Sequence, residues 1–477
     1  MSKVVLVCAP SMEKAYHGLQ SFVAVIPPTS LLTIASCLER AGHEVMLLDG
    51  DGLSLDFENT LSKALSYKPD YVGLTSMTAT MDIAMCFCER IKEANHAITT
   101  ILGGIHATAL PVKTIEDYPC VDYVVKGEGE YTVVKLLDIL ASGGSCDSLE
   151  GMTFRKGSRI IDNPQPKPIY NLDDLPLPAY HLLNYSRYRS YGWNGWETGV
   201  RAPVGVIYTA RGCYRNCSFC SSKVVSGRGI RCFSVKRVME ELDVLVRRYK
   251  IKILYIQDDT FAVNKKRAME ICEEILRRGY TLEIMIAARC DEVDSELYKK
   301  LREAGVTWCC YGVESGNQEI LNSIGKGITL DNVYNAFEAA NRAGFHIGGN
   351  FMLGFPDETW DTAMDTIHLA VKELKMDYAS FAICVPYPGT DIYYNAIARG
   401  IKMPEWTNFG LVNTPPIALS ELTVGQLYAL RRIATIRFFS RPQYVGRILR
   451  KFKKNIVMRD FVNTGAAIIK EIAAKRF

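Results

Sequence analysis

Three cysteines with the spacing Cys213-x-x-x-Cys217-x-x-Cys220 are the residues of this sequence best suited to chemistry. Thiolates this close on one loop can converge on a single metal centre. A four-iron cluster usually takes four cysteines, so a set of three leaves one iron open to a small molecule. The alternatives are three unrelated thiols or a zinc site, for which Cys232 is the only nearby fourth ligand. The spacing therefore predicts a 4Fe-4S cluster with one exposed iron.

The elements that must position these cysteines form an alternation of strands and helices. A strand expected at 204–209 ends shortly before Cys213, and further strands are expected at 253–257, 283–287, 307–313, 347–353 and 378–385. Six such units predict a partial (β/α)6 TIM-type barrel. Catalytic groups of such barrels gather at the carboxyl ends of the strands, which is where the cysteine loop is expected.

The cysteine loop after the first barrel strand resembles that of the radical S-adenosylmethionine (SAM) superfamily. This resemblance implies that the open iron chelates the amino and carboxylate groups of SAM. It also implies that reduction of the cluster cleaves SAM to a 5′-deoxyadenosyl radical, which removes a hydrogen atom from the substrate.

The same resemblance assigns SAM contacts to residues at successive strand ends. It implies adenine contact through the backbone of Phe219, pairing of the methionine carboxylate with Arg289, and ribose contacts at the end of the fourth strand. Taken singly, each position is equally explained as a strand-end turn or a helix cap. The implied SAM-binding residues are Phe219, Asp258, Asp259, Arg289, Gly312, Glu314 and Ser315. The substrate pocket is expected to include Tyr311, Asn350 and Tyr387.

Residues 1–145 carry a separate strand–helix alternation, with strands expected at 4–8, 44–48, 71–76, 100–103 and 122–126. Five strands with right-handed crossovers predict a Rossmann-like domain. Small or polar residues gather at four strand ends, where such sheets bind their ligands. These segments are Asp49-Gly-Asp51, Thr75-Ser76, Gly103-Gly104 and Gly127-Glu128. A large polar ligand is therefore expected there.

Placed before a radical SAM barrel, this domain resembles the cobalamin-binding branch of the superfamily. The resemblance implies that its glycines allow close approach of the nucleotide tail of cobalamin. The implied cobalamin-binding residues are Asp51, Thr75, Ser76, Thr78, Gly103, Gly104, His106, Gly127 and Glu128. Two alternatives stay open: a degenerate, ligand-free domain, or a methylthiotransferase-like domain. The second would carry three further cluster cysteines, and Cys8, Cys37, Cys86 and Cys88 do not match their spacing.

The rest of the chain divides into a proline-rich linker at 146–199, the barrel at 200–400 and a basic helical C-terminal region at 401–477. From residue 420 onward, thirteen Lys and Arg stand against three Asp and Glu. Helices are expected at 427–439 and 444–455, and the cationic face of the second is explained by a solvated surface or by peripheral membrane contact. Because the positive charge is local, nucleic-acid binding is not expected. Scattered cysteines and the absence of a signal-peptide pattern predict a cytoplasmic protein.

Together these features predict a radical SAM enzyme, most simply a cobalamin-dependent methyltransferase that acts on an unactivated carbon. The segment 437–442 resembles branch members related to the anaerobic magnesium-protoporphyrin cyclase and to lipid-modifying enzymes, which favours a bulky lipid-like or tetrapyrrole-like substrate. Radical cyclisation or oxidation without methyl transfer is the alternative, and a non-catalytic cobalamin and iron–sulfur protein is another. The implied protein partner is an electron donor of the flavodoxin or ferredoxin type.

Many cobalamin domains carry Asp-x-His-x-x-Gly, whose histidine ligates cobalt from below. The segment 49–54 lacks this histidine. His106 is a rival lower ligand, but we expect it to pack against the cobalamin tail instead. We therefore predict cobalt without a lower histidine ligand. The paramagnetic-resonance spectrum of protein reconstituted with cob(II)alamin should show no splitting from an axial nitrogen, and such splitting would contradict the prediction.

Overall fold

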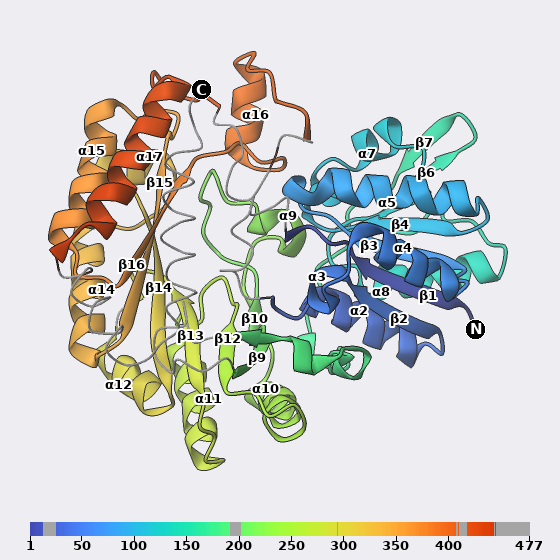
Figure 1. Ribbon diagram of the computed structural model, residues 1–477, viewed down its shortest axis with the longest axis horizontal. Coiled ribbons are helices and arrows are strands. Elements are labelled where there is room, and N and C mark those ends of the chain that lie inside the picture. Colours follow the sequence, from blue (N-terminus) through green and yellow to red (C-terminus); the bar gives the residue numbers. More distant parts are fainter. Residues whose placement is uncertain are drawn as a thin grey trace.

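Two seven-stranded sheets, joined by an irregular linker, form the body of the protein (Figure 1). The computed structural model describes residues 1–12, 25–190, 202–292, 294–406, 409, 417–442 and 444. In Figure 1 the N-terminal sheet and its helices lie on the right in blue and cyan, and the second sheet curls on the left in green to orange. The helix α9 (Ser222–Ser226) and the strand β10 (Ala210–Arg211) lie between them.

The N-terminal domain is a doubly wound sheet in the order β2-β1-β3-β4-β5-β6-β7. Its strands are β1 (Lys3–Cys8), β2 (Glu44–Asp49), β3 (Tyr71–Thr75), β4 (Thr99–Gly103), β5 (Tyr123–Val125), β6 (Met152–Lys156) and β7 (Arg159–Asp162). Its helices are α2 (Thr29–Arg40), α3 (Gly50–Leu53), α4 (Phe57–Ser66), α5 (Met81–Ala94), α6 (Ile105–Ala109), α7 (Pro111–Asp117) and α8 (Glu130–Ala141). The five parallel strands confirm the predicted Rossmann-like domain. The antiparallel hairpin β6–β7 extends the same sheet beyond residue 145, and the proline-rich stretch begins only after it.

Continuous burial of β1 explains how this sheet packs. Val4 and Leu6 lie in one apolar cluster with α2 and α8, and Val5 and Val7 lie in another with α5. Successive side chains of a strand point to opposite faces, so an unbroken apolar run requires cover on both sides. The cluster on the α2 and α8 side continues through the linker into the core of the second sheet. The two domains therefore share one apolar core along that side.

The second sheet has the order β16-β15-β14-β13-β12-β9-β8 and curls into a partial barrel, as predicted. Its strands are β8 (Arg189–Ser190), β9 (Ala202–Ile207), β12 (Ile253–Ile256), β13 (Glu283–Ala288), β14 (Val306–Glu314), β15 (His346–Leu353) and β16 (Tyr378–Ile383). All neighbours from β9 to β16 are parallel, and no pairing joins β8 to β16 in the described part of the chain. The barrel is therefore open at these two edges.

Helices cover the outside of the barrel, and side-chain caps start most of them. They are α10 (Val235–Asp243), α11 (Lys265–Arg277), α12 (Ser295–Glu303), α13 (Gln318–Ser323), α14 (Leu330–Ala343), α15 (Trp360–His368), α16 (Asp391–Ala398) and α17 (Val424–Phe439). Short polar residues such as Ser234, Asn264 and Asp294 accept hydrogen bonds from the first turn of the helix that follows. The caps thus define where each helix begins, and therefore where the preceding loop at the carboxyl end of the sheet ends.

The C-terminal region agrees with the sequence where it is described. The helix α17 confirms the helix expected at 427–439 and packs on β16. The helix expected at 444–455, with its cationic face, lies outside the described residues. Within the described ranges, every helix is too short or too polar to span a bilayer.

The linker ties the end of β2 to the first full barrel strand through Tyr188. Its hydroxyl donates a hydrogen bond of 2.6 Å to Asp49 Oδ2, and its carbonyl accepts one of 3.1 Å from the N–H of Val204 on β9. Tyr188 is only 1% exposed. Burial raises the pKa of Asp49 although this hydrogen bond opposes the rise. Tyr188 therefore joins the two domains and supplies a partner to a buried carboxyl group.

Replacing Tyr188 by Phe should lower the free energy of unfolding by about 1–3 kcal/mol, because Asp49 loses a buried hydrogen-bond donor. Urea unfolding followed by circular dichroism measures the change. Tyr170→Phe is the matched control, since Tyr170 lies in the same linker but is 75% exposed. Equal stability of the Tyr188 variant and the wild type would show that the hydroxyl does not support the linker.

Candidate active site

The cysteine loop occupies residues 212–230, between β10 and β11 (Arg231–Cys232), at the carboxyl end of β9. Cys217 is buried, and Cys213 and Cys220 are half-buried. The N–H of Ser218 bonds to the carbonyl of Ile324 at 2.9 Å, which holds the loop against the segment after α13. The three cysteines therefore lie at the carboxyl end of the first full barrel strand, as predicted.

The donor set of this loop fits the predicted cluster. All three thiols are free. Cysteine thiolates are the ligands that hold iron–sulfur clusters in proteins. Burial raises the pKa of the Cys217 thiol and raises that of Cys220 to about 11, so cluster assembly must displace their protons.

Asp258 anchors the start of this loop. Its Oδ1 accepts hydrogen bonds of 2.6 Å and 3.0 Å from the N–H groups of Thr209 and Ala210, and its Oδ2 accepts the Thr209 hydroxyl. Arg267 of α11 adds bonds to Thr209 and to the carbonyl of Phe233, on the far side of the loop. Burial raises the pKa of Asp258 to about 6. These contacts give Asp258 a structural task, and its contact with SAM stays a prediction.

Asp259 differs from its neighbour because it is exposed. Its Oδ2 accepts a hydrogen bond of 2.7 Å from the hydroxyl of Ser222, just after the third cysteine. Its charge also contributes to the raised pKa of Cys220, so the carboxylate lies near that thiol. An accessible carboxylate beside the cluster loop suits a positively charged amino group.

A distortion at the end of β14 aims Glu314 into the site. The strand register shifts between Gly312 and Glu314, and Glu314 has a φ of 72°, in the left-handed region that non-glycine residues rarely adopt. The buried Glu314 carboxylate lies 2.8 Å from Lys326 Nζ. A Cβ at Gly312 would lie 2.6 Å from Glu314 Oε1 and 2.9 Å from Lys326 Nζ. Only glycine at 312 leaves room for this pair.

Lys326 was missed by sequence reasoning. It lies in the loop after α13, far along the chain from the cysteines, and its positive charge acts on Cys217. Arg289 approaches the same thiol and is held by Asp291 Oδ1 at 2.9 Å and by the carbonyl of Lys326 at 2.9 Å. The only sequence signal was a lysine between two glycines, Gly325 and Gly327, which is typical of many turns. Two buried cations therefore stand where a carboxylate of SAM is expected.

The remaining residues predicted to contact SAM or the substrate do not all point toward the site. The Ser315 hydroxyl is buried against α15, 3.1 Å from Thr366 Oγ1, so it points toward the helix layer. The prediction that Tyr311 lines the substrate pocket is wrong, because its hydroxyl lies 2.5 Å from that of Tyr298 on the outer helix α12. Asn350 is exposed on β15 and has the opposite side-chain direction from buried Phe351. The ring centroids of Phe219 and Phe355 are 5.5 Å apart, and those of Tyr387 and Phe409 are 6.1 Å apart.

In the N-terminal domain, the ends of β3 and β4 are packed too closely for any side chain at Gly104. Its φ is 94°, and a Cβ there would lie 2.5 Å from the carbonyl oxygen of Ser76 and 2.8 Å from Thr75 Oγ1. The Ser76 hydroxyl donates to the carbonyl of Gly103 at 3.1 Å. Gly127 also has a positive φ, and its N–H donates to Thr108 Oγ1 at 3.1 Å. These residues form a tight, small-residue floor, as close approach of a large ligand requires.

His106 lies beside this floor. Its Nδ1 is 3.1 Å from Thr78 Oγ1, and its ring meets the Trp406 ring edge to face at 5.0 Å between centroids. Burial lowers the pKa of His106 to about 4, so the imidazole is neutral at physiological pH. The fold thus brings Thr78 and His106 together, as expected of two residues predicted to bind the same cofactor.

The strand order of the N-terminal sheet bears on the prediction that cobalt has no lower histidine ligand. The order reverses between β1 and β3, and such a switch point is where open α/β sheets bind ligands. Asp51 follows β2 instead, and its Oδ2 accepts hydrogen bonds of 2.9 Å and 3.2 Å from the N–H groups of Ser11 and Met12. Asp51 therefore holds the start of the β1 loop. Residues 13–24 of that loop lie outside the described residues, and cobalt without a lower histidine ligand stays a prediction.

The two predicted cofactor sites meet at α6 and α9. A Cβ at Gly389, after β16, would lie 2.6 Å from Val224 Cγ2 on α9 and 3.1 Å from Ala109 Cβ on α6. Lys223 Nζ lies 2.7 Å from Asp391 Oδ1 at the start of α16. The helix that follows the Gly103-Gly104 strand end is therefore in direct contact with the helix that follows the cysteines.

Glu358, just beyond β15, is a deeply buried carboxyl group of which only one oxygen has a hydrogen-bond partner. It is 1% exposed, its Oε2 accepts the N–H of Gly354, and its Oε1 has no hydrogen-bond partner. Burial raises its pKa to about 7. A raised carboxyl pKa means that the folded state prefers the protonated form, so its stabilising contribution is lost as the pH rises through 7.

Relative to the wild type, Glu358→Gln should therefore gain stability by up to about 3 kcal/mol as the pH rises from 4.5 to 8. Guanidinium unfolding at a series of pH values measures this difference. Glu338→Gln, on the exposed side of α14, is the control. A constant difference between the Glu358 variant and the wild type across this range would refute the assignment.

Comparisons with known proteins agree with this geometry. The model of the radical SAM superfamily matches residues 207–370, and that of the B12 binding domain matches residues 18–137. An uncharacterized methyltransferase of Pyrococcus horikoshii is 36% identical over 92% of this chain and 93% of its own length. The hopanoid C-3 methylase of Methylococcus capsulatus is 30% identical, over 77% and 68%. The anaerobic magnesium-protoporphyrin IX monomethyl ester cyclase of Rubrivivax gelatinosus is 25% identical, over 92% and 81%.

Among solved structures, the radical SAM methyltransferase TsrM of Kitasatospora setae, with tryptophan substrate and a SAM analog bound, has a TM-score of 0.67. The match covers 85% of this chain and 78% of TsrM at 20% identity, which shows a shared fold. The predicted cofactors, a 4Fe-4S cluster, SAM and cobalamin, are those of the two matched domains. With a cysteine loop on an open barrel, a small-residue floor at the strand ends of the N-terminal domain and these relatives, the chain belongs to the cobalamin-binding radical SAM enzymes.

Proposed function

We propose that this enzyme methylates an unactivated carbon of a bulky, hydrophobic small molecule. The observation that carries the proposal is the contact of α6 with α9, because it brings the cobalamin end of one domain to the cluster loop of the other. SAM bound to a reduced cluster supplies a carbon-centred radical, and cobalamin supplies a methyl group. Contact between the two loops is what a substrate shared by both cofactors needs.

The protein's own residues hold and shield the reactants. Cys213, Cys217 and Cys220 hold the cluster. Asp259 is placed to accept the amino group of SAM, and the pair of Lys326 and Arg289 to attract its carboxylate. The remaining predicted SAM and cobalamin contacts belong to the same proposal.

The substrate class is supported by two of the relatives, which act on hopanoids and on a magnesium porphyrin ester by their names. Beside its charged groups, the carboxyl end of the barrel carries uncharged polar side chains: Tyr208 is 40% exposed and donates to Gln257 Oε1 at 3.0 Å, and Asn350 is exposed. Uncharged hydrogen-bonding groups on an open sheet suit a large apolar substrate with few polar groups. An electron donor of the flavodoxin or ferredoxin type, and membrane contact through the basic tail, complete the proposal.

Cyclisation or oxidation without methyl transfer is the second candidate, and the similarity to the magnesium-protoporphyrin cyclase favours it. The two candidates differ in what becomes of the methyl group of SAM. Methyl transfer consumes one SAM as radical source and one as methyl donor, and therefore forms S-adenosylhomocysteine beside 5′-deoxyadenosine. Cyclisation forms only 5′-deoxyadenosine.

The test uses anaerobically reconstituted protein, dithionite, cobalamin and SAM labelled in its methyl group, with a panel of hopanoid and porphyrin substrates. We expect 5′-deoxyadenosine, S-adenosylhomocysteine and label in the product. The triple variant Cys213→Ala, Cys217→Ala, Cys220→Ala should lose its iron and form 5′-deoxyadenosine at least about 10³-fold more slowly. Cys272→Ala, a buried cysteine on the outer helix α11, is the control. 5′-Deoxyadenosine with unlabelled product would exclude methyl transfer and favour cyclisation.

A further inference from the structure

Two arginines mark the neck of the cysteine loop. Arg211 on β10 and Arg231 on β11 are directly paired across an antiparallel ribbon, and the residues between them carry all three cluster cysteines. Like charges on paired strands repel each other, so these two guanidinium groups require negative partners. The partners come from the other domain.

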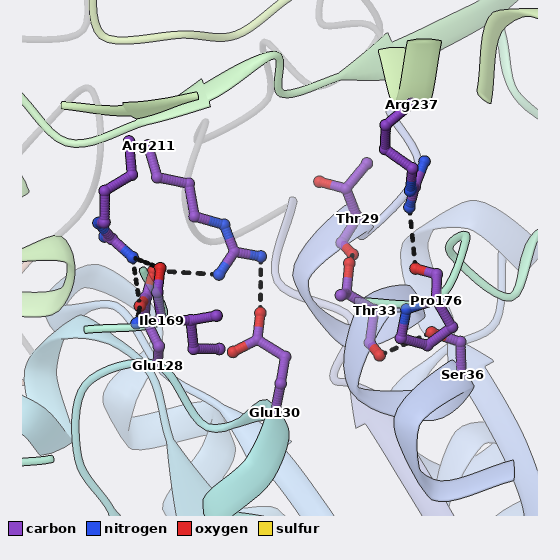
Figure 2. Close-up of polar contacts among 10 residues, drawn as sticks. Thr29, Thr33, Ser36, Glu128, Glu130, Ile169, Pro176, Arg211 and Arg237 are labelled. Carbon is purple, nitrogen blue, oxygen red and sulfur yellow. Dashed lines mark hydrogen bonds and ion pairs between the residues drawn. The ribbon is translucent and has the colours of Figure 1, made fainter. Parts of the chain in front are cut away.

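Glu128 and Glu130, at the carboxyl end of β5, provide those partners. Arg211 Nη1 lies 3.1 Å from Glu128 Oε1, and its Nη2 lies 2.6 Å from Glu130 Oε1 (Figure 2). Arg231 Nη1 lies 2.7 Å from Glu128 Oε2. The linker completes the arrangement, because the N–H of Ile169 donates to Glu128 Oε2 at 2.7 Å and its carbonyl accepts from Arg231 at 2.7 Å. We call the four charged side chains the neck clamp.

The neck clamp is withdrawn from solvent. The exposed fractions of its side chains are 4% for Glu128, 6% for Glu130, 17% for Arg211 and 11% for Arg231. Burial alone would raise the pKa of Glu128, but the hydrogen bond from Arg231 and the charge of Arg211 lower it overall. The geometry of the network is fixed, since a planar guanidinium bonds two acceptors in set directions.

We propose that the neck clamp is a positioning device that sets the separation of the cluster from cobalamin. Its two arginines hold both ends of the cysteine loop, and Arg211 is separated from Cys213 by one residue. Its two carboxylates follow Gly127, at a strand end of the cobalamin domain. Within the clamp, one arginine and one glutamate are enough to connect the two cofactor loops. The connection along the chain, through the linker, is longer. The two arginines engage both carboxylate oxygens of Glu128. A direct contact between Glu128 and cobalamin stays a prediction.

The barrel offers a matched arrangement that lacks this connection. Arg237 of α10 lies 3.3 Å from Glu241 Oε2 and donates to the carbonyl of Pro176 at 3.0 Å (Figure 2). Its side chain and that of Glu241 are 8% and 9% exposed, so this pair is as buried as the neck clamp. It ties the linker to the barrel but touches neither cofactor loop. Loss of Arg237 therefore reports the general effect of breaking a buried ion pair.

The inference rests on the two-cofactor site and not on methyl transfer, so its test needs no substrate. The full-length holoenzyme carrying cluster and cob(II)alamin is reduced with dithionite, and the spin relaxation of cob(II)alamin is measured by pulsed paramagnetic resonance. A nearby reduced cluster accelerates this relaxation with a steep dependence on distance. We compare Glu130→Gln and Arg231→Lys with Arg237→Lys and the wild type.

We expect both clamp variants to lose most of the cluster-induced acceleration while still binding iron and cobalamin, and the Arg237 variant to keep it. Wild-type relaxation in both clamp variants, or an equal loss in the Arg237 variant, would overturn the proposal. If a clamp variant does not load its cofactors, hydrogen exchange of the unloaded full chain decides. Faster exchange confined to segments 126–130 and 210–232 supports positioning, and faster exchange throughout the barrel overturns it. Absence of methyl transfer in the wild type would leave these outcomes unchanged.

Discussion

Two arginines side by side on paired strands, both largely withdrawn from solvent, are unfavourable by themselves, and the fold is arranged around the carboxylates that compensate them. Because Glu128 and Glu130 come from the N-terminal domain, Arg211 and Arg231 have full partners only when the two domains are docked. A buried charge without a partner costs several kcal/mol, so separated domains are disfavoured. The shared apolar core on the α2 and α8 side contributes area to this docking, whereas the charges specify its geometry.

A second constraint lies in the backbone at the end of β14. Glu314 adopts a left-handed conformation next to a register shift, and a non-glycine residue there is strained by about 1–3 kcal/mol. The strain persists because Glu314 is paired with Lys326, and because Gly312 leaves space for both side chains. The fold thus fixes a buried carboxylate and a buried ammonium beside Cys217, which is the kind of preorganised polar arrangement that electrostatic stabilisation requires.

The sequence was informative wherever function depends on local spacing. The three cysteines lie within eight positions, and the glycines at strand ends follow apolar runs, so both could be placed from the pattern alone. Side-chain direction was less accessible, because it depends on the pleat and on bulges: Tyr311 points to α12 rather than into the pocket, and Ser315 points to α15. Lys326 joins the site from a loop that only tertiary folding brings there. The β6–β7 hairpin was overlooked because short antiparallel strands next to prolines look like linker.

The open edge between β8 and β16 has a consequence for how such a chamber adapts to its contents. A closed barrel has a diameter fixed by its strand number and shear, and widening it breaks a ladder of hydrogen bonds. A sheet with two free edges can instead flatten or tighten by small changes in twist between neighbouring strands, with each ladder intact. The internal width is then determined by what supports the two ends of the sheet. These supports are α17 behind the edge strand β16 and, at the other end, Tyr188, which bonds to β9 next to the edge strand β8. Molecules of quite different girth can be accommodated within one unchanged strand order.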